Sequence, residues 1–314
     1  MNILFIDTAH SFLIDSLRGD GHRCIEAYDW SREKVLLEIG NVQGIVIRSR
    51  IVIDRQFLDA AIDLKFIARA GAGMESIDLE YAGQKNIKCL NSPEGNRDAV
   101  AEHAIGMLLS LFNNLNRADR EIRNGEWIRE KNRGVELNGK TVGIIGYGNM
   151  GSTFAKRLKG FDCKILVYDK YLKSIRDSHV EQVEMNRLFE EADVLSLHVP
   201  LTDETTYLVD DIFINRFEKA FYLINTARGK CVRIADVVKN IKSGKIKGAC
   251  FDVFEYEDLS FEKFSIELAG LTSNPDWQYL IQSDQVMLSP HIAGWTHESL
   301  KKIAEVLYSK IKAL

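Results

Sequence analysis

Three residues in the second half of the chain have side chains suited to proton transfer and anion binding. Arg228 lies in the run LINTARGK, Glu257 ends the run GACFDVFEYE, and His291 lies in VMLSPHIAGW. A histidine can exchange a proton near neutral pH, and a carboxylate beside it favours its protonated form. The planar guanidinium of an arginine can bind a carboxylate through two parallel hydrogen bonds. The three residues together predict a site that binds an organic acid and moves a proton.

A glycine-rich turn lies near the middle of the chain. The run TVGIIGYGNMG places Gly146, Gly148 and Gly151 directly after an apolar strand pattern. This spacing is typical of dinucleotide binding, because the glycines permit a tight turn, close approach of a pyrophosphate, and packing of the next helix on the strand. The next apolar run, KILVYD, ends in Asp169, where a carboxylate can bind the ribose hydroxyls of NAD and repel the extra phosphate of NADP. We interpret the following Lys170 as an exposed lysine rather than a phosphate ligand.

A nicotinamide cofactor carries a hydride, so the protein has to supply the proton and hold the substrate. An arginine, a glutamate and a histidine are the set needed to reduce a 2-keto acid in this way. Ligands of open parallel sheets bind at the carboxyl ends of the strands, where the glycine turn also lies. Asp252 and the three residues above follow predicted strands, so we expect all four to face the cofactor.

Two series of short apolar runs alternate with helical patterns and have to position these residues. The first series contains NILFID, GIVIRS, KFIARA and IKCLNS, and the second contains TVGIIG, KILVYD, VLSLHV, FYLINT, GACFDV and VMLSP. This alternation predicts an α/β fold with parallel sheets and crossover helices. One long helix is predicted over 98–123 and a last one over 297–313. His103, on the apolar side of the long helix, is interpreted as structural.

These motifs, in this order over nearly the whole chain, resemble the D-isomer-specific 2-hydroxyacid dehydrogenase family. The matching blocks also include IRSR, ARAGAGMESID, NSPEGNRDAVAEHAIGMLL and VLSLHVPLTDETTYLV. The resemblance implies two Rossmann-like or flavodoxin-like domains, with an NAD-binding domain of residues 98–289 inserted into a substrate domain of residues 1–97 and 290–314. It also implies a homodimer formed through the cofactor domain, for which the stretch 98–123 and the segment after it are candidates.

The resemblance further implies a role for each matching residue. Arg228 would bind the substrate's carboxylate and carbonyl, His291 would be the acid/base, and Glu257 would be its partner. Backbone amides near Ala72 and Gly73 would help to hold the substrate carboxylate. Implied cofactor contacts are Gly146, Tyr147, Gly148, Asn149, Met150, Gly151, Asp169, His198, Pro200, Thr205, Thr226, Ala227, Asp252 at the nicotinamide end, and Gly294. His198 is expected to line the adenine pocket rather than to take part in the chemistry.

One departure from the family pattern concerns the catalytic loop. The family usually has a proline directly after the catalytic glutamate, and here Asp258 stands at that position. The segment 258–285 also looks longer than usual. Both features bear on which substrate the chain accepts more than on the catalytic residues.

The substrate class is suggested by the block IRSR. Arg48 and Arg50 lie two positions apart, so on an extended strand both would point to one face and could bind a phosphate. This block resembles the 3-phosphoglycerate dehydrogenases of serine biosynthesis, and 3-phospho-D-glycerate is therefore the first choice of substrate. The alternatives are hydroxypyruvate or glyoxylate reduction, and a structural ion pair for one of the arginines. Trp295, close to His291 in the sequence, could wall the substrate pocket or serve in packing. A different class, a non-catalytic NAD-sensing adaptor, is also compatible with these residues.

Composition narrows the remaining possibilities. The chain has 314 residues, 46% of them hydrophobic and 27% charged, and a net charge of −4. It has no basic patch and no long apolar run, so we expect neither nucleic acid nor a membrane as partner. The five cysteines form no Cys-x-x-Cys pair, which predicts reduced thiols, no metal and a cytoplasmic location. We also expect no C-terminal regulatory domain, and hence no feedback control by serine through one.

Overall fold

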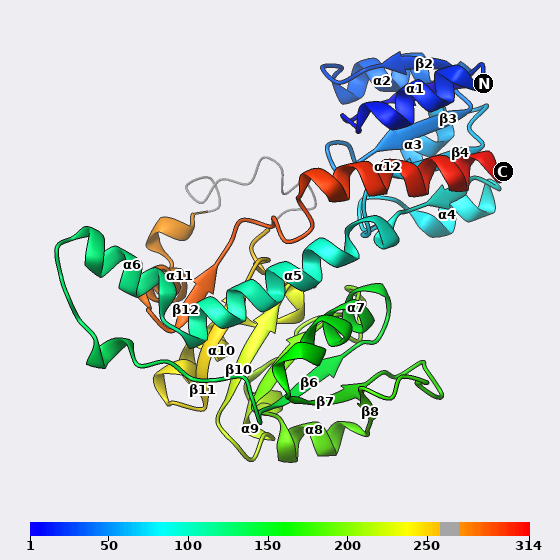
Figure 1. Ribbon diagram of the computed structural model, residues 1–314. Coiled ribbons are helices and arrows are strands. Elements are labelled where there is room, and N and C mark those ends of the chain that lie inside the picture. The colour runs from blue at the N-terminus through cyan, green and yellow to red at the C-terminus, as the bar shows by residue number, and fades with distance from the viewer. Residues whose placement is uncertain (258–269) are drawn as a thin grey trace. The chain divides into compact units, whose positions relative to one another are not determined.

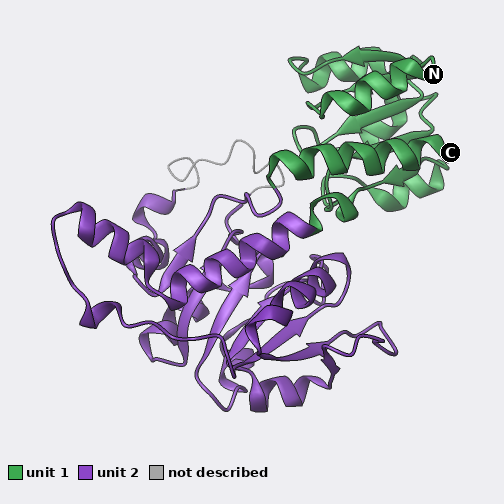
Figure 2. Cartoon of the chain, in the orientation of Figure 1, with its two compact units in different colours: residues 1–97, 258–264, 295–314 green, residues 98–257, 265–294 purple. Residues whose placement is uncertain are grey.

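The computed structural model describes residues 1–257 and 270–314 (Figure 1). The described chain divides into two compact units, one of residues 1–97 and 295–314 and one of residues 98–257 and 270–294 (Figure 2). The sequence analysis placed these divisions after residues 97 and 289. Asp258 and the residues up to 269, where the departure from the family pattern begins, lie outside the described residues.

The first unit is built on a five-stranded sheet in the order β2-β1-β3-β4-β5, in which all the pairs are parallel. Its strands are β1 (Asn2–Phe5), β2 (Arg23–Glu26), β3 (Gly44–Ile47), β4 (Phe66–Arg69) and β5 (Lys88–Leu90). Its helices are α1 (Ser11–Gly19), α2 (Arg32–Glu38), α3 (Arg55–Ala60), α4 (Leu79–Gln84) and α12 (His297–Lys312). This strand order is the flavodoxin-like one, whose switch point lies between β1 and β3.

Both faces of the first sheet are covered by helices. Leu4 and Ile45 pack with residues of α2, α3 and α4, whereas the neighbouring Ile3 and Val46 pack with α1 and α12. Alternate residues of a strand point to opposite faces, so a sheet that is buried on both sides needs near-continuous apolar strands. All four residues of β3 are buried, as this arrangement requires. The last helix of the chain thus completes the core of the first unit.

The second unit is built on a seven-stranded parallel sheet in the order β12-β11-β10-β9-β6-β7-β8. Its strands are β6 (Thr141–Ile145), β7 (Lys164–Tyr168), β8 (Glu181–Gln182), β9 (Val194–Leu197), β10 (Phe221–Asn225), β11 (Ile246–Phe251) and β12 (Val286–Leu288). Its helices are α5 (Pro93–Phe112), which begins in the first unit, α6 (Leu115–Arg123), α7 (Asn149–Leu158), α8 (Met185–Glu191), α9 (Asp211–Asn215), α10 (Ile234–Lys242) and α11 (Pro275–Gln282). The strand order is that of a Rossmann fold, with its switch point between β6 and β9. The predicted α/β class with two parallel sheets is confirmed.

The helix predicted over 98–123 is wrong as a single element. The structure has α5 over Pro93–Phe112 and α6 over Leu115–Arg123, and Asn114 between them has a φ of 53°. Asparagine tolerates this left-handed conformation better than most residues, and one such residue ends a right-handed helix. The periodic apolar pattern concealed the break because both helices continue the same pattern.

Candidate active site

Glu257 and His291 meet at the carboxyl ends of the neighbouring strands β11 and β12. Atom Nδ1 of His291 lies 2.7 Å from Oε2 of Glu257, and the other carboxylate oxygen accepts a hydrogen bond of 2.6 Å from the N–H of Phe254. An ionised carboxylate only accepts hydrogen bonds, so the hydrogen of this contact is carried by Nδ1. Nε2 is therefore the ring atom of His291 that can exchange a proton with a ligand.

The turn that carries His291 is held by Asp252. His291 has a φ of 55°, a left-handed conformation that costs energy for a residue with a side chain. Its N–H donates to the carbonyl oxygen of Asp252 at 2.8 Å. The Asp252 carboxylate, in a residue that is only 1% exposed, accepts from the amides of Ile292 and Ala293 at 2.9 and 2.8 Å. Asp252 therefore positions the backbone around His291, a role that the sequence analysis did not assign to it.

Ser289 and His103 extend this network, and the sequence analysis placed neither of them in it. The hydroxyl of Ser289 donates to Oδ1 of Asp252 at 2.6 Å, and Nε2 of His103 lies 2.9 Å from the same hydroxyl oxygen. Because the single hydroxyl hydrogen goes to the carboxylate, Nε2 of His103 has to donate to Ser289. The one signal in the sequence was a serine two positions before His291.

Arg228 follows β10, the strand next to β11. The buried Asn225 shapes this loop, because its side-chain amide donates to the carbonyl oxygen of Arg228 at 2.9 Å and its oxygen accepts from the N–H of Ala227 at 3.1 Å. A Cβ atom at Gly229 would lie 1.8 Å from the carbonyl oxygen of Phe254. Glycine at position 229 thus lets the Arg228 loop pack directly against the segment that leads to Glu257.

The glycine turn lies between β6 and α7, as predicted. Gly146 has a φ of 91°, and a Cβ there would lie 2.5 Å from the carbonyl oxygen of His198. A Cβ at Gly151 would lie 2.0 Å from the carbonyl oxygen of Gly146. Gly148 differs, because a Cβ at that position would meet no heavy atom within 4 Å among the residues that the structure describes. Protein packing thus accounts for the first and third glycines, whereas the second leaves room for a ligand at the N-terminus of α7.

Asp169 is fixed by the glycine turn itself. Its carboxylate accepts hydrogen bonds from the N–H groups of Tyr147 at 2.7 Å, Tyr171 at 2.9 Å and Leu172 at 3.0 Å. Partial burial of the carboxylate opposes its ionisation, but these three donors outweigh burial and lower the pKa of Asp169 below its ordinary value. Asp169 is therefore a preoriented anion at the end of β7, beside the turn.

The remaining predicted cofactor residues lie on the loops after β6, β9, β10 and β12. His198 makes a hydrogen bond of 2.9 Å with the hydroxyl of Ser196, and burial lowers the pKa of His198 to about 3, so its ring is neutral at physiological pH. Thr205 donates to the carbonyl oxygen of Pro200 at 2.7 Å, which uses its hydroxyl within its own loop. Oγ1 of Thr226 is buried without a hydrogen-bond partner in the described part of the chain. Asn149 and Met150 begin α7, Ala227 precedes Arg228, and Gly294 ends the second unit.

Arg48 and Arg50 lie in the first unit, after β3 at its switch point. The expectation that both point to one face of an extended strand is wrong, because β3 ends at Ile47 and the chain bends over 48–50. The buried carboxylate of Asp7, which follows β1, causes the bend by accepting from the backbone N–H groups of Arg48 at 2.6 Å and Arg50 at 3.4 Å.

The two arginines therefore have different surroundings. The guanidinium of Arg50 donates to Oδ1 of Asp7 at 3.1 Å, and also to the carbonyl oxygens of Trp30 at 2.7 Å and Ala27 at 3.1 Å. This is the structural ion pair that the sequence left as an alternative. The guanidinium of Arg48 instead lies over the ring of Trp295, 4.1 Å from its centroid. In the same unit, the carbonyl oxygen of Ala72, next to Gly73, accepts from the side chain of Asn91 at 2.7 Å.

Comparison with known proteins places this arrangement in a family. Residues 105–293 match the NAD-binding domain of the D-isomer-specific 2-hydroxyacid dehydrogenases. The chain belongs to this family. It is 34% identical over 99% of its length to a D-3-phosphoglycerate dehydrogenase of Archaeoglobus fulgidus, and 37% identical over 90% of its length to a glyoxylate reductase of Thermofilum pendens.

A solved structure of the family agrees with the fold. The chain aligns over its full length with 95% of a D-lactate dehydrogenase from Aquifex aeolicus, solved with NAD and lactic acid, at a TM-score of 0.82 and 28% identity. The chain spans 56% of the length of the Archaeoglobus relative and 81% of the Thermofilum relative. Among the described residues of this dehydrogenase-family chain, no helix is long and apolar enough to cross a membrane.

Proposed function

We propose that the chain catalyses the NAD-dependent interconversion of a D-2-hydroxy acid and its 2-keto acid. The observation that carries the proposal is the 2.7 Å contact between Nδ1 of His291 and Oε2 of Glu257, in the same unit as a dinucleotide-binding turn. This contact directs Nδ1 of His291 to the carboxylate, which assigns proton exchange to Nε2 and sets a carboxylate behind the imidazolium that forms. Family membership supports the same reaction.

In the proposed reaction, Arg228 binds the substrate, and His291 and Glu257 carry out the proton transfer. The guanidinium of Arg228 binds the substrate's carboxylate. In the direction of oxidation, Nε2 of His291 takes the hydroxyl proton, and Glu257 stabilises the positive ring. Bound at the glycine turn, NAD would supply the acceptor for the hydride of the substrate carbon. In reduction, His291 returns its proton to the carbonyl oxygen.

The described residues fit a dinucleotide. Gly148 leaves space beside the N-terminus of α7, where backbone N–H groups and the helix dipole favour a pyrophosphate. The charged Asp169 can accept hydrogen bonds from a ribose, since each carboxylate oxygen can accept more than one. The unpartnered hydroxyl oxygen of Thr226 supports a further cofactor contact near the end of β10.

For the substrate, we propose 3-phospho-D-glycerate, with Arg48 rather than Arg50 as the phosphate ligand. Arg50 is bound to Asp7 and to carbonyl oxygens, whereas Arg48 presents its guanidinium on the ring of Trp295. The planar guanidinium of an arginine matches the oxygens of a phosphate, and stacking on an aromatic ring orients that plane. The relatives named above include a phosphoglycerate dehydrogenase and a glyoxylate reductase, so hydroxypyruvate and glyoxylate remain the alternative substrates.

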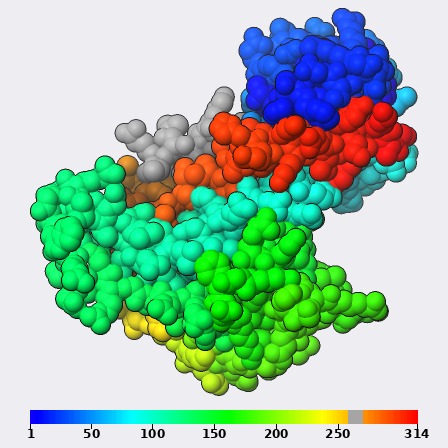
Figure 3. All heavy atoms as spheres, in the orientation of Figure 1, coloured from blue at the N-terminus to red at the C-terminus, as the bar shows by residue number. Residues whose placement is uncertain are grey.

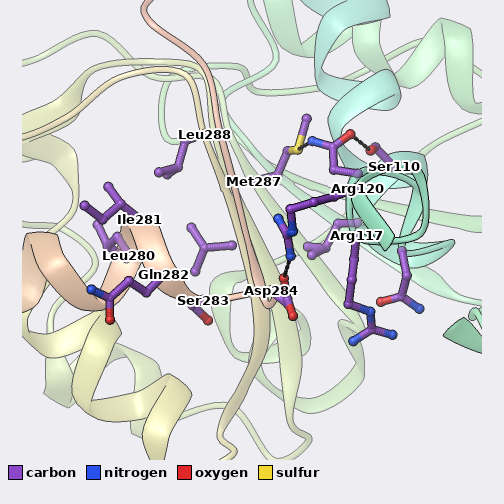
Figure 4. Close-up of a pocket in the computed structure, with 14 residues that line it drawn as sticks. Ser110, Arg117, Arg120, Leu280, Ile281, Gln282, Ser283, Asp284, Met287 and Leu288 are labelled. Carbon is purple, nitrogen blue, oxygen red and sulfur yellow. Dashed lines mark hydrogen bonds and ion pairs between the residues drawn. The ribbon is translucent and has the colours of Figure 1, made fainter. Parts of the chain in front are cut away.

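A homodimer through α6 and the segment after it is also part of the proposal. No residue of α6 is buried, and Leu115, Ile122 and Trp127 are 54, 52 and 81% exposed. These residues belong to a segment at the surface of the second unit (Figure 3, green). A pocket lies beside it between α6, α11 and β12, where Arg120 reaches Asp284 at 2.6 Å (Figure 4). An amphipathic helix with its apolar side in water is expected to be covered by a partner, here a second copy of the chain.

The experiment for the dimer is sedimentation velocity on the wild type and on Ile122→Ser/Trp127→Ser. The double variant should sediment as a monomer, whereas Ile212→Ser, at a residue that is 76% exposed on α9, should leave the sedimentation coefficient unchanged. A wild-type monomer at micromolar concentration would contradict the dimer.

A kinetic panel tests the activity. Phosphohydroxypyruvate, hydroxypyruvate, glyoxylate and pyruvate are offered with NADH and with NADPH, and oxidation of the cofactor is followed. The proposal predicts turnover with NADH and the highest kcat/KM for phosphohydroxypyruvate. Binding of NADH without turnover of any 2-keto acid would contradict the enzyme and favour the adaptor.

A further inference from the structure

An ion pair joins two loops that flank the glycine turn. Nζ of Lys170, which follows Asp169 after β7, lies 2.7 Å from Oε1 of Glu204, in the loop after β9. The hydroxyl of Tyr171 donates to the other carboxylate oxygen of Glu204 at 3.2 Å. Strands β7 and β9 are the two neighbours of β6 in the sheet. The pair therefore links the loops on either side of the turn that follows β6.

Glu204 engages the cation next to Asp169. The hydrogen bond from the ammonium of Lys170 to Glu204 is the main reason why the pKa of Lys170 is raised. A lysine directly after the ribose-binding aspartate is a side chain that could neutralise the 2′-phosphate of NADP. In this structure its ammonium is held by a carboxylate instead, and that carboxylate is itself fixed by the hydroxyl of Tyr171.

We propose that Glu204 is a specificity-determining residue that excludes NADP by holding the ammonium of Lys170. The inference rests on the proposed NAD site. To reach a 2′-phosphate, Lys170 would have to leave Glu204. The negative charges of Glu204 and Asp169 would then both lie near the phosphate, with no cation paired to Glu204. Binding of NAD does not require Lys170 to leave Glu204, because the ribose of NAD has only hydroxyl groups at this position. Rejection thus comes both from the repulsion of two carboxylates and from the loss of the ion pair.

The test is a fluorescence titration of the protein with NADH and with NADPH, which requires no turnover. Glu204→Gln keeps the size of the side chain and removes its charge, and more than half of the Glu204 side chain is exposed, so the fold is not at risk. We expect NADPH to bind about fivefold more tightly to Glu204→Gln, and NADH to change by less than about twofold.

Two further variants show whether Lys170 carries the effect. Lys170→Ala in the Glu204→Gln background should abolish the gain in NADPH affinity, whereas Lys170→Ala alone should produce no gain. Glu305→Gln, which breaks an exposed pair with Lys301 on α12, changes the net charge equally and should leave both affinities as they are.

The outcomes separate the two proposals. Wild type that binds NADH, with Glu204→Gln no better than wild type for NADPH, would overturn the role of Glu204 and leave the NAD site standing. A gain that survives Lys170→Ala would also overturn it, since the lysine would not be the phosphate ligand. Wild type that binds neither dinucleotide would contradict the proposed function, and this inference with it.

Discussion

The carboxylate of Glu257 lies 2.7 Å from the imidazole of His291, and both residues belong to one compact unit. The turn of His291 is fixed by backbone hydrogen bonds to Asp252, and the orientation of Glu257 is fixed by the N–H of Phe254. The proposed acid/base pair is thus assembled within the NAD-binding unit alone. An acid/base group that is held in this way does not have to be ordered again in each turnover.

Replacing Glu257 by glutamine should separate its two roles. The carboxylate accepts from both Phe254 and His291, whereas an amide has one acceptor oxygen and has to turn its NH₂ group toward one of these donors. A charged hydrogen bond of this kind is worth about 1.5–3 kcal/mol, so kcat should fall roughly 10- to 100-fold. Steady-state kinetics give kcat, and a titration with NADH gives the control. A variant with wild-type kcat would show that Glu257 does not support His291.

Alanine substitutions at Gly148 and Gly151 of the turn should have different effects. Gly148→Ala places a methyl group in open space at a φ of −74°, so the protein should keep its melting temperature but bind NADH at least about tenfold more weakly. Gly151→Ala places a methyl group 2.0 Å from the carbonyl oxygen of Gly146 and should lower the melting temperature. Thermal melts and NADH titrations of both variants distinguish the two effects. Unchanged NADH affinity in a folded Gly148→Ala variant would contradict the proposed pyrophosphate position.

Arg48 and Arg50 should behave differently when each is replaced by alanine. Arg48→Ala should lower kcat/KM for phosphohydroxypyruvate about 100-fold and for hydroxypyruvate less than about fivefold, because only the former carries a phosphate. Arg50→Ala leaves the buried Asp7 without its cation and should destabilise the first unit by about 2–3 kcal/mol. Equal losses of kcat/KM with the two substrates for Arg48→Ala would contradict a phosphate preference.

His198 should make stability depend on pH. Burial lowers the pKa of His198 to about 3, so below the unfolded value near 6.5 the unfolded chain binds a proton that the folded chain does not. The stability that depends on neutral His198 is therefore fully present above about pH 6.5 and falls as the pH is lowered, by about 2 kcal/mol at pH 5. Urea unfolding at pH 7 and pH 5 should show this loss in the wild type and about 2 kcal/mol less of it in His198→Gln. The same pH dependence in both proteins would contradict a neutral buried His198.

The fold, and the strand ends at which the proposed catalytic residues lie, could be predicted from sequence because each depends on local signals. Near-continuous apolar strands, glycines of fixed spacing and polar residues just after strands all report on one end of a parallel sheet. Arg228, Glu257 and His291 follow neighbouring strands for this reason. The network of His103, Ser289 and Asp252 was not accessible, because it joins a helix to two strand ends that lie far along the chain, with Ser289 186 positions after His103.

Arg48 and Arg50 illustrate a second limit of prediction from sequence. Their spacing of two implies one face only if the strand continues, and the strand ends at Ile47. The residue that bends the chain is Asp7, more than forty positions earlier, at the end of the neighbouring strand β1. The residue pattern of one segment does not show that a buried carboxylate from a different segment will bind its backbone. Similarly, the break at Asn114 depends on one residue with a φ of 53° within a pattern that otherwise continues.

The most direct test of the account is kcat for His291→Ala beside its affinity for NADH. General acid–base catalysis by one group is worth about 10²–10⁴-fold, so kcat for reduction of the preferred 2-keto acid should fall by that factor. The Kd for NADH should stay within about twofold, since the contacts proposed for the cofactor do not include the imidazole. A kcat equal to that of the wild type would contradict the assignment of His291 as the proton donor.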